Sequence, residues 1–138
     1  MTSTSNTTDW SEQDLFDYLK INWYPDLVMS KKQMSRWDCY SPMLKYRIEL
    51  KCRKAHYDSL MLEKTKYDAM IEKSRDHGDT PLYINSTPEG VYEFDLNNIT
   101  PKWEKMSLSK TTEFDNNNKV TKEVTMIPIK KALKIKHQ

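Results

Sequence analysis

Three residues of this sequence have the types and the spacing that suit hydrolysis of a phosphate ester. Glu49 and Lys51 lie two positions apart in the run 45–53, where apolar and charged side chains alternate, and Asp38 lies in a short run upstream. If 45–53 is a strand, its apolar side chains point to one face, while Glu49 and Lys51 share the other. We therefore take the charged face as the candidate site.

Phosphodiester hydrolysis needs a neutralised phosphate, hydroxide near neutral pH and stabilisation of the charge that develops on the leaving oxygen. A divalent ion can serve all three needs. Mg²⁺ is held by oxygen ligands, usually one or two carboxylates together with waters and substrate phosphate. Asp38 and Glu49 on neighbouring strands would supply that pair, and Lys51 would reach the attacking water or the phosphate. The predicted cofactor is therefore Mg²⁺, or Mn²⁺ in its place.

Basic charge is concentrated in the middle of the chain. The net charge is only +2, but positions 45–75 carry nine Lys or Arg against five Asp or Glu. A basic surface with a few acids could bind the phosphate backbone of a nucleic acid while the acids bind a metal ion. Lysine-rich surfaces, however, also occur in proteins where they only keep the surface solvated. Arg53 and Lys54, at the end of the alternating run, are the candidates here for contacts to nucleic acid.

The periodicity and the breakers predict an α/β fold, a central mixed β-sheet flanked by helices, in a single domain over 1–138. Residues 1–8 are expected to be flexible and 130–138 to form a basic C-terminal tail. Asp9 is the expected N-cap of the first helix. Residues 97–118 are expected to be irregular, with a helical turn near Trp103. The predicted helices are 10–21 and 56–74, and the predicted strands are 26–30, 36–40, 45–53, 82–85, 91–94 and 120–129.

Several classes of protein are disfavoured. The N-terminal residues are polar and do not form a secretory signal, and no stretch is apolar enough to span a membrane, so we expect a cytoplasmic protein, in the host cytoplasm if it is phage-encoded. Cys39 and Cys52 have no zinc-ligand spacing and are expected as buried thiols. The two glycines do not suffice for a P-loop or a dinucleotide-binding loop.

The residues from Asp38 onward resemble the PD-(D/E)xK nuclease superfamily. Asp38 matches its first acid, and Glu49-Leu50-Lys51 matches the ExK element on a following strand. Glu63 to Tyr67 is similar to the Q/E-x-x-x-Y pattern of phage exonucleases and helicase-associated nuclease domains. The resemblance covers roughly residues 9–95 and implies a restriction-endonuclease-like core. The chain departs from the pattern at Trp37, where the family has Pro, and at Glu63, where many relatives have Gln.

The resemblance also implies a role for each matching residue. Asp38, Glu49 and Lys51 would be catalytic, with the two acids and the Leu50 carbonyl binding the metal and Lys51 assisting the attack of water. Glu12 on the first helix would be a further metal ligand. The remaining matches would face the same cleft and contact the nucleic-acid backbone, namely Glu63, Lys64 and Tyr67.

These observations predict a metal-dependent nuclease that hydrolyses nucleic acid, with DNA as the expected substrate, by metal-activated water. A homodimer or a partner protein would supply a second cleft. One alternative is a catalytically inactive nucleic-acid-binding module of the same fold, in which tyrosines stack on bases. Another is a protein-interaction domain, in which the four tryptophans form an exposed patch. The tyrosines in question are 40, 46, 57 and 67, and the tryptophans are 10, 23, 37 and 103.

Overall fold

A computed structural model of the chain describes residues 9–30, 38–109 and 119–137. The helices are α1 (Glu12–Asn22) and α2 (Lys64–His77), with short 3-10 turns η2 (Leu96–Asn98) and η3 (Ile129–Lys131). The strands are β1 (Val28–Met29), β2 (Asp38–Ser41), β3 (Tyr46–Cys52), β4 (Ser59–Glu63), β5 (Thr80–Thr87), β6 (Gly90–Asp95), β7 (Glu104–Ser109), β8 (Lys119–Pro128) and β9 (Leu133–His137).

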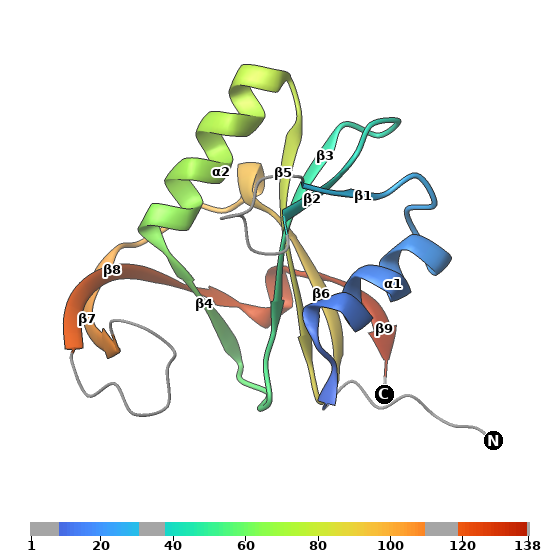
Figure 1. Cartoon of the computed structure of the whole chain (residues 1–138). Coiled ribbons are helices and arrows are strands. Elements are labelled where there is room, and N and C mark those ends of the chain that lie inside the picture. Colours follow the sequence, from blue (N-terminus) through green and yellow to red (C-terminus); the bar gives the residue numbers. More distant parts are fainter. Residues whose placement is uncertain (1–8, 31–37, 110–118, 138) are drawn as a thin grey trace.

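Within the described ranges, the strands form two sheets. The larger sheet has the order β1-β2-β3-β5-β6-β9, and it is mixed because β3 and β5 are parallel while the other neighbours are antiparallel. The smaller sheet has the order β4-β8-β7 and is antiparallel. Helices α1 and α2 lie on opposite sides of the larger sheet (Figure 1). The expected sheet between helices is therefore confirmed.

A separate hydrophobic core lies on each face of the larger sheet. On the first face, α1 packs against the sheet through Leu15 and Leu19, which meet Ile48 and Leu50 of β3. On the second face, β4, α2 and β8 cover β5 and β6, and Phe94 is fully buried there. The alternation of β3 explains how one strand serves both faces, because its apolar residues enter the first core and its charged residues point to the second face.

Most of the predicted strands are confirmed, with shifted ends. The strands predicted at 26–30, 45–53 and 120–129 correspond to β1, β3 and β8, and the predicted hairpin corresponds to β5 and β6. The strand predicted at 36–40 corresponds to β2 from Asp38 onward. Residues 36 and 37 lie outside the described residues. Cys39 is buried and Cys52 is half-buried against the first core, and both are free thiols.

Four local predictions were wrong. The helix expected at 56–74 begins only at Lys64, because Ser59–Glu63 form β4 and pair with β8. The segment expected to be irregular at 97–118 contains β7, and its residues 110–118 lie outside the described part of the chain. Ser11 rather than Asp9 caps α1. The segment expected as a basic tail contributes β9, which pairs with β6.

The described residues contain no helix that is long and apolar enough to cross a membrane.

Candidate metal-dependent active site

The register of β2 against β3 places two of the predicted acids opposite each other. Asp38 pairs with Glu49 across the antiparallel ladder. Since directly opposed positions of an antiparallel pair belong to the same face of the sheet, position 38 lies on the face that carries Glu49 and Lys51. Only the backbone of Asp38 is described here. The upstream acid is therefore at the register position that the predicted constellation requires.

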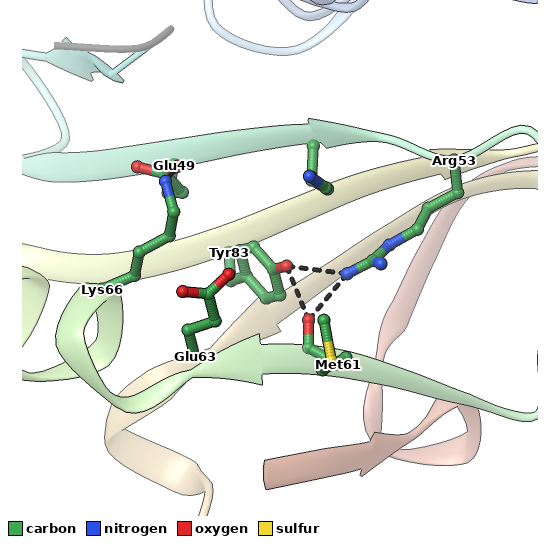
Figure 2. Close-up of a pocket in the computed structure, with 7 residues that line it drawn as sticks. Glu49, Arg53, Met61, Glu63, Lys66 and Tyr83 are labelled. Atoms are coloured by element: carbon green, nitrogen blue, oxygen red, sulfur yellow. Dashed lines mark hydrogen bonds and ion pairs between the residues drawn. The ribbon is translucent and has the colours of Figure 1, made fainter. Parts of the chain in front are cut away.

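A small pocket of about 30 Å³ lies on this face, between β3 and the layer formed by β4 and α2. This volume has room for little more than a water molecule or two. Figure 2 shows side chains converging on it from β3, β4, β5 and α2. Its lining residues are Glu49, Lys51, Arg53, Met61, Glu63, Lys66 and Tyr83.

Glu49 is the buried acid of the pocket. The residue is 7% exposed, and its Oε2 lies 3.1 Å from the Nζ of Lys66 on α2. Burying a carboxylate is unfavourable unless a cation or hydrogen-bond donors compensate its charge. Lys66 supplies that compensation in this structure. Sequence reasoning did not single out Lys66, although it lies inside the Glu63–Tyr67 run.

Lys51 lies among charges of both signs. Partial burial lowers the pKa of Lys51 from its ordinary value, and the nearby cations Arg53 and Lys66 lower it further. Glu12 and Glu63 act in the opposite direction. The charge of Glu12, from the first turn of α1, therefore reaches Lys51, although Glu12 does not line the pocket. Arg53 and Lys66 would favour an anion near Lys51, whereas Glu12 and Glu63 would favour a cation there.

Arg53 forms part of the pocket wall through several hydrogen bonds. Its guanidinium donates to the Oδ1 of Asn85 at 2.9 Å, to the carbonyl of Met61 at 2.6 Å and to the hydroxyl of Tyr83 at 3.0 Å. The Tyr83 hydroxyl donates in turn to the Met61 carbonyl at 2.9 Å (Figure 2). Arg53 thus ties β3 to β4 and β5 beside the candidate site.

Of the other residues predicted to contact nucleic acid, only Glu63 lines the pocket. Glu63 lines the pocket, and its Oε1 lies 3.3 Å from the Nζ of Lys122 on β8. Tyr67 instead packs edge-on against Trp103, and Lys64 pairs with Asp68 and lies over the same indole ring. Lys64 and Tyr67 therefore do not line the pocket, and Lys54 is exposed at the end of β3.

The chemistry of the donor set fits a divalent ion of the Mg²⁺ type. In the described part of the chain, no three His, Cys, Asp or Glu residues gather as a metal-binding group. Mg²⁺ is commonly bound through only one or two protein carboxylates, with water and phosphate completing the shell. Glu49 lines the pocket and could supply one such carboxylate, and the backbone of Asp38 lies opposite it in the β2–β3 register. The Leu50 side chain enters the first core, so only its backbone could contribute to such a site.

The alternatives that depended on aromatic side chains receive less support. Trp10 packs against the first core, whereas Trp103 meets Tyr67, which packs against the second, so these two do not share a surface patch. Trp37 lies outside the described residues. Among the tyrosines proposed for stacking on bases, Tyr46 packs against Tyr24 and Tyr67 against Trp103, whereas Tyr40 and Tyr57 are exposed.

No protein-family model matches the sequence, and no curated protein matches it. Among solved structures, the fold is similar to that of Hjc, a Holliday junction resolvase from Archaeoglobus fulgidus, an archaeal hyperthermophile. The TM-score is 0.55 and the identity 16%, over 90% of this chain and 93% of that one. A likeness at this identity concerns the fold. The chain has the α/β fold with a mixed central sheet and a restriction-endonuclease-like core that the superfamily resemblance implied.

Proposed function

We propose that this protein is a metal-dependent nuclease that hydrolyses phosphodiester bonds in DNA. The observation that carries the proposal is the convergence of Glu49 and Lys51 on one pocket, with Asp38 opposite Glu49 in the β2–β3 register. The similarity of the fold to that of a Holliday junction resolvase supports DNA as the substrate. The finer resemblance to phage exonucleases stays a prediction.

Each residue of the chain has a distinct role in this proposal. Glu49 and Asp38 hold the divalent ion, with the Leu50 carbonyl and Glu12 as further candidate ligands. When bound, Mg²⁺ or Mn²⁺ supplies charge neutralisation at the phosphate and activates water at neutral pH. Lys51 orients the attacking water and stabilises charge on the phosphate oxygens.

The test is cleavage of labelled DNA in linear, single-stranded, circular and branched forms, with Mg²⁺, Mn²⁺ or EDTA. We expect metal-dependent cleavage of at least one form, and a loss of about 10²-fold or more in Glu49→Gln and in Lys51→Met. Glu49→Gln keeps the shape of the side chain and removes its charge. If wild-type protein cleaves no form with either metal, the enzyme assignment is wrong.

A second candidate function is a binding module without catalysis. It is favoured by the ion pair that already satisfies Glu49 and by the three cations that line the pocket with it. Such a pocket can accept a phosphate without any metal. Calorimetry with Mn²⁺ distinguishes the two functions, because the module binds DNA in a salt-sensitive way but gives no metal isotherm that depends on Glu49.

A further inference from the structure

Lys66 lies beside the Glu49 carboxylate to which the proposed function assigns a metal ion. Its Nζ lies 3.1 Å from Glu49 Oε2, and the two side chains are 25% and 9% exposed. Lys66 projects from the first turn of α2, which follows β4 directly. In Figure 2 the Lys66 side chain extends across the pocket toward Glu49 on β3.

Two other charged groups of the pocket wall are engaged elsewhere, and Lys51 is the remaining lining cation beside Lys66. The Arg53 guanidinium donates to Asn85, Met61 and Tyr83. Glu63 is paired with Lys122, 3.3 Å away. Lys66 is thus the lining residue whose ion pair must open before a divalent ion can bind Glu49 at that oxygen, since a carboxylate oxygen ligates Mg²⁺ at about 2.0–2.1 Å. An ammonium and a divalent ion that close together would also repel each other.

We propose that Lys66 is the resident counter-ion of Glu49, that the incoming divalent ion displaces it, and that the displaced ammonium then contacts a phosphate of the bound DNA. This inference rests on the proposed nuclease function and adds a positioning residue to it. Before the metal ion binds, Lys66 holds the buried Glu49 carboxylate in place. After the metal ion binds, the Lys66 ammonium contacts a DNA phosphate.

The first measurement is Mn²⁺ affinity by calorimetry, without DNA. Lys66→Met removes the competing cation, so we expect Mn²⁺ to bind about three- to tenfold more tightly than to wild type. Lys66→Gln keeps a hydrogen-bond donor for Glu49 without the charge, and it should show the same direction even if Lys66→Met folds poorly. Lys73→Met, on the same helix about two turns further on, removes one charge away from the pocket and should leave the affinity unchanged.

The second measurement is binding of a short DNA duplex and of a branched DNA in the presence of Ca²⁺, at several salt concentrations. Loss of one phosphate contact lowers the slope of log K against log salt by about 0.9. We expect that reduction in Lys66→Met and Lys66→Gln, together with weaker DNA binding.

The outcomes separate the two ideas. If wild type and both Lys66 variants bind no Mn²⁺, the proposed function fails and this inference fails with it. If wild type binds Mn²⁺ and cleaves DNA, but both Lys66 variants bind Mn²⁺ with unchanged or lower affinity, only the role of Lys66 is overturned. An unchanged salt slope in both variants would remove the phosphate contact from the proposal.

Discussion

Arg53 is an example of a residue whose charge suggests one role and whose surroundings suggest another. Its place in a basic run led us to predict a contact to nucleic acid. In the structure, its guanidinium joins three neighbouring segments by hydrogen bonds to Asn85, Met61 and Tyr83. Asn85 is fully buried and Tyr83 is nearly so, which means that water would not easily replace the arginine as their partner.

We expect Arg53→Met to lower the free energy of unfolding by about 2–3 kcal/mol, because buried acceptors lose a charged donor. Urea denaturation followed by circular dichroism measures this change. Lys54→Met is the matched control, since Lys54 is exposed at the next position, and it should change stability by less than about 0.5 kcal/mol. A purely nucleic-acid-binding arginine would instead leave the urea midpoint unchanged.

A partly buried polar pair lies on the opposite face of the sheet. The Tyr24 hydroxyl donates a hydrogen bond to Glu93 Oε1 on β6. Burial raises the pKa of Glu93 above its usual range, and the donated hydrogen bond from Tyr24 partly opposes that rise. Burial, together with Glu93, likewise raises the pKa of Tyr24. The pair is thus a place where pH should affect stability.

Tyr24→Phe removes the hydrogen bond that opposes the raised pKa of Glu93, so that pKa should rise further. A raised folded-state pKa favours folding at pH below the unfolded value and is lost as pH rises through the folded value. Tyr24→Phe should therefore lower the free energy of unfolding by about 1–3 kcal/mol at pH 8. The loss should be smaller at pH 4. Thermal unfolding at both pH values measures the difference. In a Glu93→Gln background the pH dependence of the Tyr24→Phe effect should disappear.

At the scale of elements, the start of α1 shows how two nearby candidates for one role are resolved. Ser11 caps the helix: its side chain accepts from the backbone N–H of Asp14, and the Asp14 carboxylate accepts from the backbone N–H of Ser11 at 2.9 Å. Both Asp9 and Ser11 are followed three residues later by an acidic residue. The sequence pattern alone does not distinguish them, whereas the geometry of the capping box does.

Ser11→Ala should lower the free energy of unfolding by about 1 kcal/mol, the usual effect of removing an N-cap side chain. Asp9→Ala should have almost no effect, because Asp9 is exposed and precedes the cap. Chemical denaturation of the two variants in parallel provides the measurement. Equal destabilisation by both substitutions would contradict the assignment of the cap.

Most strands could be predicted, because alternation is a local signal, and β3 was found on that basis. Strand β4 was missed because Tyr57, Leu60 and Lys64 also fit a helical stripe. What decides for a strand is pairing with β8, more than 60 residues later in the chain, which buries Leu60 and Leu62. A pairing between segments so far apart in the chain cannot be inferred from the local sequence around Ser59–Glu63.

The same reasoning applies to the candidate site. Alternation placed Glu49 and Lys51 together on one face, and the β2–β3 hairpin explains the place of Asp38 opposite Glu49. The contribution of α2 could not be derived from the strands, because it depends on where the helix begins. With the start at Lys64, Lys66 reaches Glu49 while Tyr67 turns toward Trp103.

At the scale of the whole molecule, the candidate site lies where the larger sheet meets the layer of α2 and the smaller sheet (Figure 1). Residues from both sheets line it, so its geometry depends on how the layers are held together. The C-terminal segment supports the larger sheet itself, from its far edge. Strand β9 extends the larger sheet beside β6, and Ile135 is 6% exposed in the first core.

Removing residues 133–138 therefore tests whether the chain's end belongs to the folded unit. Truncation takes Ile135 out of the core and removes the carbonyl that accepts from the Tyr18 hydroxyl at 2.9 Å. It also exposes the edge of β6. Loss of one buried isoleucine alone costs about 2–5 kcal/mol, a large part of the 5–15 kcal/mol that stabilises a typical domain.

We expect the truncated protein to unfold at a midpoint lower by at least about 10 °C, or to lack a cooperative transition. Calorimetry or thermal circular dichroism measures this difference. The matched control is the full-length chain with Lys130→Ser and Lys131→Ser, which removes exposed positive charge but keeps β9. If the segment were only a basic tail, the truncation and the control would be equally harmless. A large loss confined to the truncation would instead show that β9 is needed to complete the sheet on which the candidate site is built.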